Sequence, residues 1–219
     1  MRRMPLEPMR RPIQTDIAPR TRPTQERARR TLELILDTAV ELLEEGGADG
    51  LTTKRLAERA GIRVRSVYRY FPNKLAVICA VAERMAERER DAFVAGLALS
   101  SAEMPWRLAL RRAFRAYDAA VESEPALLAV RRAVQVSPAL RAIDNRLNAA
   151  LADAWAEDLE VRGMRGGRAR RRLVARTALE IATALLDRAD LDPEVRKAAQ
   201  RREMFLAIEG YLAIYLDER

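Results

Sequence analysis

From residue 25 onward, apolar residues recur at intervals of three and four positions. In the first such segment, which stops at Gly46 and Gly47, they are Leu32, Ile35, Leu36, Ala39, Leu42 and Leu43. This interval follows the turn of an α-helix and places the apolar side chains on one face. Nothing in the N-terminal half alternates as a half-buried strand would. The spacing therefore predicts an all-α fold.

Glycines and prolines divide the chain into nine predicted helices. Their expected ranges are 25–47, 53–60, 64–70, 74–97, 106–124, 126–136, 139–161, 169–187 and 194–216. Residues 1–24 hold five of the ten prolines and show no periodicity, so we expect a disordered basic arm there. Residues 25–74 form a short helical head, and residues 75–219 form a larger helical body that the fourth helix joins to it.

Composition excludes several classes of protein. The longest apolar run, residues 75–82, is far shorter than the roughly 20 residues that cross a bilayer. The chain has no histidine, and Cys79 is its single cysteine. These counts exclude Ser-His, Cys-His and histidine-metal sites as well as an internal disulfide. We expect a cytoplasmic protein that is not an enzyme and has no metal, cofactor or membrane partner.

Positive charge is concentrated in one short segment. Residues 52–74 carry seven basic residues and one acidic residue, whereas the sequence after residue 74 is about neutral. A local basic cluster is the electrostatic footprint of a surface that binds a polyanion, because neutralising phosphates releases their counterions.

The same segment has the spacing of a helix-turn-helix. Two short helices are joined through Gly61, which can adopt the left-handed conformation of the turn, and Leu56 and Val67 supply a small core. Thr52 and Thr53 can cap the first of the two helices and leave backbone N–H groups free for a phosphate. The segment therefore predicts a DNA-binding head.

Two groups of residues in this region carry a family resemblance. They are Thr52-Thr53, Leu56-Ala57 and Ala60-Gly61-Ile62, followed by the run Val67-Tyr68-Arg69-Tyr70-Phe71-Pro72-Asn73-Lys74. With them, residues 25–80 resemble the tetracycline-repressor (TetR) family of one-component transcriptional regulators. The resemblance implies that the third helix enters the major groove and that Thr53, Tyr70 and Lys74 touch phosphates.

The residues expected at DNA are Thr52, Thr53, Arg63, Val64, Arg65, Ser66, Arg69, Tyr70 and Lys74. Arg63 departs from the family, which usually has a capping serine at this place. Either the cap is supplied otherwise or Arg63 is used for DNA. We assign Tyr68 and Phe71 to the core, and single arginines such as Arg55 and Arg59 can equally be solvated surface charge.

The last two predicted helices are more apolar than one buried face requires. The resemblance implies that such a pair forms a four-helix bundle between two subunits, as a DNA-reading head on a pseudo-palindromic operator needs. The residues expected at this dimer interface are Leu179, Leu186, Phe205, Ile208 and Leu212. The alternative is that both helices belong to the core of a single chain.

Aromatic residues mark a third candidate site, in the body. Phe93, Trp106, Phe114, Tyr117 and Trp155 lie on inward stripes of the fourth, fifth and seventh helices, and Asp144 lies close to one of these stripes. A cavity lined in this way suits an apolar or aromatic effector, although residues at helical spacing can also be plain core.

We therefore interpret the chain as a homodimeric, ligand-responsive regulator, most simply a repressor that a small apolar or aromatic effector releases from its operator. Residues 75–219 would then be the effector-binding and dimerisation domain. The rival interpretation is a helical ligand-sequestering or scaffold protein without specific DNA binding, which the unusual Arg63 keeps open. A histidine-free enzyme is disfavoured, because no titratable residues converge in the sequence.

Overall fold

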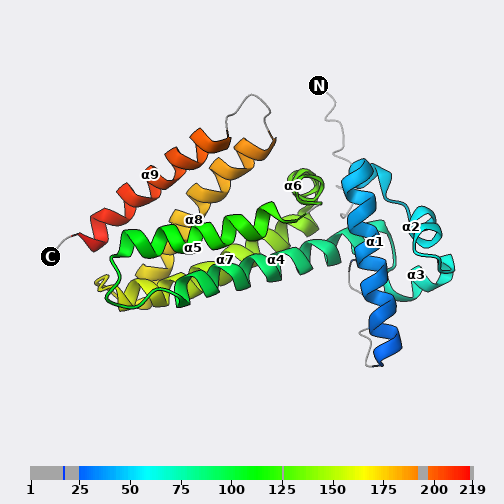
Figure 1. Ribbon diagram of the computed structural model, residues 1–219, viewed down its shortest axis with the longest axis horizontal. Helices are drawn as coiled ribbons and strands as arrows, with labels where there is room; N and C mark the ends of the chain where they lie inside the picture. The colour runs from blue at the N-terminus through cyan, green and yellow to red at the C-terminus, as the bar shows by residue number, and fades with distance from the viewer. Residues whose placement is uncertain (1–16, 18–24, 125, 192–196, 218–219) are drawn as a thin grey trace, which may run out of the picture.

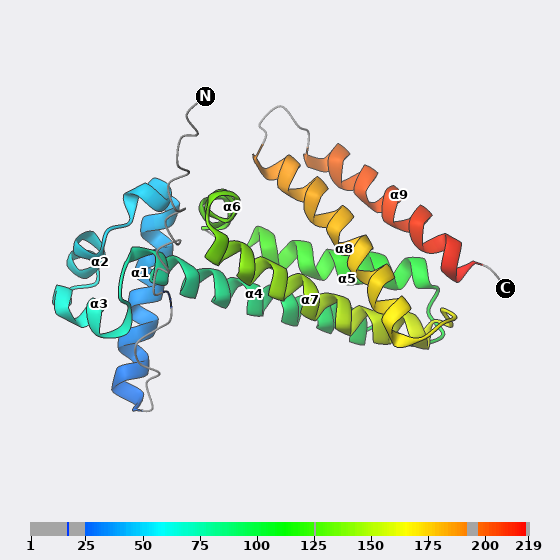
Figure 2. The ribbon, with the colours of Figure 1, turned by 180° about the vertical axis from the view of Figure 1, so that it is seen from behind.

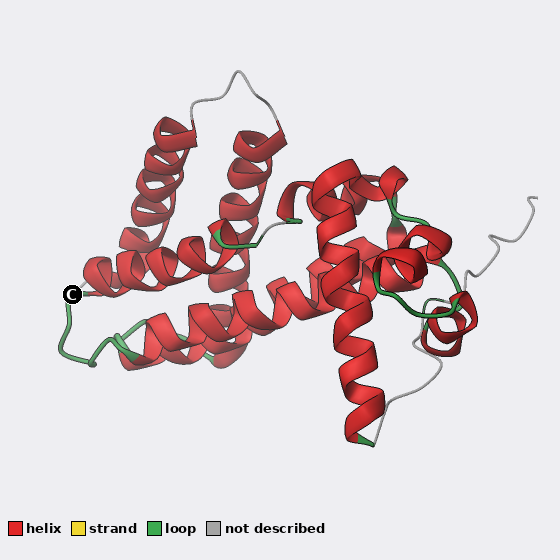
Figure 3. Ribbon diagram, turned by 45° about the vertical axis from the view of Figure 1, so that its right-hand side comes forward, coloured by secondary structure: helices red, strands yellow, loops and turns green. Residues whose placement is uncertain are grey.

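The computed structural model describes Ile17 and residues 25–124, 126–191 and 197–217. The described residues form nine helices and no strand, as Figure 3 shows, which confirms the predicted all-α fold. The helices are α1 (Glu26–Gly50), α2 (Thr53–Arg59), α3 (Val64–Tyr70), α4 (Lys74–Ala98), α5 (Trp106–Glu122), α6 (Leu127–Val136), α7 (Pro138–Val161), α8 (Arg168–Leu191) and α9 (Lys197–Leu216). Within these residues, no helix is long and apolar enough to cross a membrane.

The head and the body lie at opposite ends of an elongated molecule (Figure 1). Helices α1, α2 and α3 form the head, and α4 runs from it along the body beside α5 and α7. Helix α8 crosses α5, in front of it in the view of Figure 2, and packs on α7, and α9 lies along α8 on the outer side. The short helix α6 sits at the junction and contacts α1. The predicted disordered arm, apart from Ile17, lies outside the described residues.

Side-chain caps explain where α2 and α4 begin. The Thr52 hydroxyl accepts a hydrogen bond from the Arg55 backbone N–H at 3.1 Å and starts α2. The Asn73 side chain accepts one from the Ala76 N–H at 2.9 Å and starts α4. Gly61 has φ +64°, the left-handed conformation expected for the turn between α2 and α3. Such caps satisfy backbone groups that the first helical turn would otherwise leave open.

The predicted end of the first helix at Gly46 and Gly47 needs a correction. Gly47 has a non-helical backbone (φ 61°, ψ −163°) and kinks the helix, but helical geometry resumes and continues to Gly50. The last helix begins at Lys197 in the structure, and part of the predicted start, residues 192–196, lies outside the described range. The other boundaries differ from the prediction by a few residues, which is the usual scatter at helix ends.

The hydrophobic core of the head extends into the body. A single buried cluster joins α1, α2 and α3 to the first half of α4, to α6 and to the start of α7. Its members on α6 and α7 and just before α6 are Ala126, Val130, Ala133, Leu140 and Ile143. The proposed boundary at residue 74 is therefore crossed by continuous apolar packing, and it stays a prediction.

Helices α4 and α5 lie close together at Gly96. A Cβ atom at this position would lie 2.8 Å from the Ala113 Cα and 3.1 Å from the Ala116 Cβ. A few residues away, Phe93 and Phe114 pack edge to face with ring centroids 5.9 Å apart. The absence of a side chain at residue 96 is thus what allows the two helix backbones to meet.

The residues predicted at a dimer interface lie in the core of a single chain. Ile208 and Leu212 are 0% and 1% exposed, and Leu179 and Leu186 are also buried. Phe205 is half-buried and stacks edge to face on Phe114 at 5.4 Å. These side chains pack against helices of their own chain, and their contact with a second subunit stays a prediction.

Candidate DNA-binding surface and inner cavity

Helix α3 has one inward and one outward face. Val67 and Tyr70 are buried against the rest of the head, whereas Val64, Arg65 and Arg69 are exposed, as is Arg63 before the helix. Ser66 is half-buried. An exposed short helix that carries arginines and small side chains, braced from behind, can enter the major groove and present donors to base edges.

The burial of the two tyrosines of α3 is the reverse of what the sequence predicted. Tyr70 is 3% exposed and its hydroxyl donates a hydrogen bond to the Ala28 carbonyl of α1 at 3.3 Å, so its contact with a phosphate stays a prediction. Tyr68, assigned to the core, is 43% exposed, and its hydroxyl lies 3.2 Å from the Thr53 hydroxyl. Positions two apart on a helix face opposite ways, and α1 covers only the side of Tyr70. Phe71 is buried, as predicted.

Two arginines of α2 brace the head. Arg59 makes a bidentate ion pair with Glu45 of α1, with N–O distances of 2.8 and 3.1 Å, and this bond holds the pKa of the exposed Glu45 carboxyl below its ordinary value. Arg55 donates to the Gly50 carbonyl at 2.7 Å. These contacts tie α2 to the end of α1, a role that the sequence analysis did not predict for Arg55 and Arg59.

The remaining predicted residues surround α3 at its two ends. Thr52 caps α2, and Thr53 stands at its first turn. Arg63 occupies the N-cap position of α3 without a capping hydrogen bond from its side chain, so the guanidinium is not used as a cap. The Lys74 ammonium, at the start of α4, donates to the Ala48 carbonyl at 3.1 Å. Contact of any of these groups with DNA stays a prediction.

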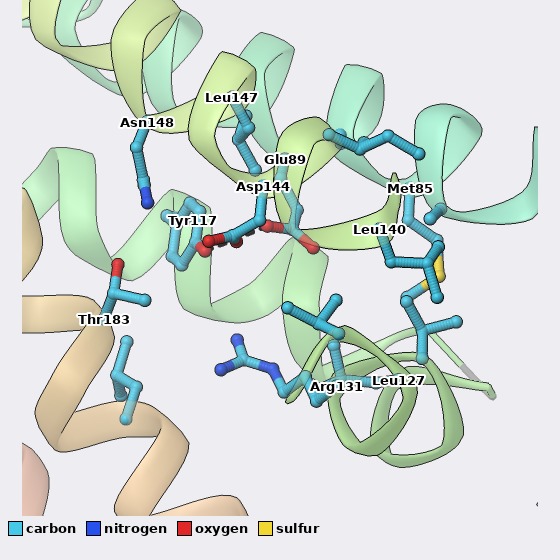
Figure 4. Close-up of a pocket in the computed structure, with 16 residues that line it drawn as sticks. Met85, Glu89, Tyr117, Leu127, Arg131, Leu140, Asp144, Leu147, Asn148 and Thr183 are labelled. Carbon is cyan, nitrogen blue, oxygen red and sulfur yellow. Dashed lines mark hydrogen bonds between the residues drawn. The ribbon is translucent and has the colours of Figure 1, made fainter. Parts of the chain in front are cut away.

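An inner cavity lies between α4, α5, α6, α7 and α8 (Figure 4). Its polar lining consists of Glu89, Tyr117, Arg131, Asp144, Asn148 and Thr183. Its apolar lining includes Met85, Leu127, Val130, Leu140, Leu147 and Leu186. The cavity measures about 60 Å³, well below the roughly 300–1,000 Å³ of pockets that hold drug-sized ligands. A ligand of that size must therefore push the surrounding helices apart.

Glu89 is the most unusual group in the cavity. It is 7% exposed, and the Tyr117 hydroxyl donates to its Oε2 at 2.9 Å. Burial raises the pKa of Glu89 most, while the hydrogen bond from Tyr117 and the charge of Arg131 act in the opposite direction. Burial and the neighbouring Glu89 charge raise the pKa of Tyr117 well above its ordinary value, so this phenol stays a neutral donor.

The structure separates the residues predicted to line an effector pocket. Tyr117 and Asp144 line the cavity, and Phe93 and Phe114 line a smaller adjoining one. Trp155 is buried against Phe93 with ring centroids 5.8 Å apart and reaches neither cavity.

Trp106, predicted to line an effector pocket, lies away from the inner cavity. Its indole N–H donates to the Asp217 carboxylate at 2.9 Å, near the C-terminal end of α9, and its side chain does not line the cavity. Because Trp106 is the first residue of α5, it lies at the end of the body that is far from the head.

Sequence reasoning missed Glu89, Arg131, Asn148 and Thr183. A signal for two of them was present. Glu89 follows Met85 by four residues and precedes Phe93 by four. Arg131 likewise follows Leu127 by four residues. A charged residue in line with an apolar stripe indicates a buried charge. Within the described ranges, no three Cys, Asp or Glu side chains gather as a metal site would need.

Comparison with known families agrees with this geometry. The family model of bacterial regulatory proteins of the tetR type matches residues 35–81, and the tetracycline repressor-like C-terminal domain model matches residues 105–212. The chain belongs to the TetR family. Regulators of this family are DNA-binding proteins rather than enzymes, and the alternative of a ligand-sequestering protein without DNA binding is not favoured.

Similarity to individual TetR proteins covers part of the chain. The class C tetracycline repressor of Escherichia coli is 49% identical over 53 residues, which is 24% of this chain and 24% of that protein. The class D repressor of the same organism is 38% identical over 84 residues, or 38% of this chain and 36% of the relative. The match thus spans about a quarter to a third of the length of these curated relatives.

The whole TetR fold is shared with solved structures. A TetR-family transcriptional regulator from Streptomyces coelicolor superposes with a TM-score of 0.66 at 21% sequence identity, covering 85% of this chain and 82% of that one. At this identity the likeness concerns the fold.

Proposed function

We propose that this TetR-family protein is a cytoplasmic transcriptional repressor whose α3 reads an operator in the major groove. The observation that carries the proposal is the exposed face of α3, with Arg65 and Arg69 turned outward and Val67 and Tyr70 holding the helix from behind. It lies within residues 35–81, which match the family model of bacterial regulatory proteins of the tetR type.

Two copies are needed to read two successive major grooves, and the outer face of α8 and α9 suits their contact. Leu206, Gly210 and Ile214 follow one another at intervals of four residues on α9. Leu206 and Ile214, together with Leu173 of α8, are more than half exposed in the single chain. Such a stripe buries apolar area in a symmetric contact, and the glycine allows close approach.

Leu206→Arg should give monomers in analytical ultracentrifugation, whereas an unchanged dimer would place the interface elsewhere.

The inner cavity can couple to the head through α4. Met85 and Glu89 of α4 line the cavity, whereas further along the helix Gly96 meets the backbone of α5. Toward the head, Arg84 of α4 forms an ion pair with Asp37 of α1 at 2.6 Å. An effector that widens the cavity would move α4 about its fixed end near Gly96 and carry the head with it. The change in DNA-binding free energy that the effector causes is limited by how much more tightly the effector binds the displaced state than the resting state.

Fluorescence anisotropy with DNA from upstream of the protein's own gene tests the repressor proposal. We expect specific binding that falls by about three to five orders of magnitude between roughly 50 and 200 mM salt, for about six to ten phosphate contacts in a dimer. Arg65→Ala should lower the preference for operator over random DNA by about tenfold or more, whereas Lys74→Ala should weaken both alike.

Arg115→Ala is the matched control, because Arg115 is an exposed arginine of α5. It should leave both the affinity and the preference unchanged. Equal affinity of the wild-type protein for upstream and random duplexes would refute the proposed function.

A further inference from the structure

The inner cavity is lined by more acidic than basic side chains. Figure 4 shows the side chains of Glu89, Asp144 and Tyr117 directed into the same cavity, with the Arg131 guanidinium entering from α6, and the Asp144 charge acts on Glu89. Glu89 comes from α4 and Asp144 from α7. When all three groups are ionised, two negative charges stand against one positive charge. The rest of the wall is mainly aliphatic.

A further carboxylate, that of Glu124, acts on Glu89 from beyond the lining. It raises the pKa of Glu89, but the Glu124 carboxylate is held by Arg88 at 2.9 Å. Asp144 likewise raises the pKa of Glu89, whereas Arg131 lowers it. Two carboxylates that share a desolvated space repel each other, and a positive charge placed between them removes that cost.

Resting on the proposed effector site, we propose that the effector is an amphipathic organic cation. An amine of this kind would place its ammonium group at Glu89 and Asp144 and lay its hydrocarbon part against Met85, Leu140 and Leu147. The ammonium donates hydrogen bonds, which the carboxylates accept, while the hydrocarbon part leaves water for the aliphatic wall.

An anionic effector is the opposite prediction, and the lining opposes it. Arg131 would have to bind the anion while both carboxylates remain nearby. A neutral effector gains the aliphatic contacts but leaves the repulsion between Glu89 and Asp144 in place. The cavity should therefore rank ligands of equal size by charge, with the cation first and the anion last.

Three probes with the same hydrocarbon part test this ranking on the full-length protein. They are 4-phenylbutylamine, 4-phenyl-1-butanol and 4-phenylbutyrate, titrated by isothermal calorimetry at neutral pH up to millimolar concentration. We expect the amine to bind about tenfold to a hundredfold more tightly than the alcohol, as hydrogen bonds to charged groups allow. The carboxylate should bind most weakly.

Glu89→Gln assigns the preference to a residue. The amide oxygen can still accept the hydrogen bond from Tyr117, but the charge is gone, so the amine should lose its advantage over the alcohol. Asp91→Asn is the control, because it removes an exposed carboxylate two positions along α4 that pairs with Arg90. It should preserve the advantage. Asp144→Asn provides a second test on α7.

The pH dependence gives an independent readout. A cation favours ionised Glu89, so amine affinity should rise as pH increases through the raised pKa of Glu89, while alcohol affinity stays nearly constant. The ligand-class proposal is overturned if the alcohol or carboxylate binds as tightly as the amine, if no probe binds, or if Glu89→Gln and Asp144→Asn both keep the amine preference.

Operator binding without any probe is measured in parallel. Specific DNA binding without an amine preference would overturn the ligand class alone. An amine preference without specific DNA binding would overturn the repressor proposal and leave the ligand class in place.

Discussion

Replacing Gly96 by alanine should destabilise the protein, although alanine is the better helix former. In an open helix this change would stabilise by about 1 kcal/mol. At residue 96, however, the new Cβ would lie 2.8 Å from the Ala113 Cα, 3.1 Å from the Ala116 Cβ and 3.3 Å from the Arg112 carbonyl oxygen. Two of these atoms belong to the backbone of α5 and cannot rotate away.

The net effect follows from the two opposing contributions. Overpacking of a filled interface costs about 1–3 kcal/mol, and three simultaneous close contacts with little freedom to yield place Gly96→Ala in the upper part of that range. Subtracting the gain in helix propensity leaves a loss of about 1–2 kcal/mol in the free energy of unfolding.

Urea denaturation followed by circular dichroism measures this loss, with Gly46→Ala as the matched control. No atom outside α1 lies within 4 Å of the position where a Cβ at residue 46 would be, so the control should be neutral or stabilising by up to about 1 kcal/mol. Equal stabilisation by both substitutions would refute the close approach of α4 and α5 and, with it, the fixed end of α4.

Two further predictions concern buried titratable groups. Burial and, to a lesser extent, the Glu83 charge raise the pKa of the Cys79 thiol to about 11. Its reaction with a disulfide reagent at mildly alkaline pH should therefore be at least about a hundredfold slower in the folded protein than in urea. Similar rates in the two conditions would show that the thiol is accessible in the folded protein. For Glu89, the raised pKa means that stability present below the ordinary glutamate pKa is lost as pH rises through the raised value. The melting temperature of Glu89→Gln should therefore exceed that of the wild type increasingly as pH rises, and a constant difference across pH would contradict the burial of this carboxyl.

Local chemistry explains why the head could be predicted closely. Thr52 and Asn73 are capping residues, and Gly61 permits the left-handed turn, so each signal acts within a few residues of itself. The reversed burial of Tyr68 and Tyr70 was not predictable in this way. Both are aromatic residues of a seven-residue helix, and only the position of α1, far away in sequence, decides which one is covered.

The body was harder because its apolar residues do not reveal their partners. Ile208 and Leu212 would look the same in sequence whether their neighbours belong to the same chain or to another copy. Glu89 and Arg131 were missed because charged residues are usually solvated, and only the helices packed around them make a shared cavity. Trp106 lies on an amphipathic stripe and packs at the edge of the core of the body, but its indole N–H donates to Asp217, which the sequence alone does not indicate.

The continuous packing between the head, α6 and the start of α7 has a consequence for building chimeric regulators. A transplant that exchanges residues 25–74 for the head of a relative would set a foreign α1 against native Val130, Ala133 and Leu140, side chains that share one buried cluster with the α1 of this chain. Mismatched volumes at that seam would change the resting angle of the head and the spacing between two recognition helices. A graft that brings its own α6 and the opening turns of α7 keeps the seam intact, so the exchangeable unit is discontinuous in sequence.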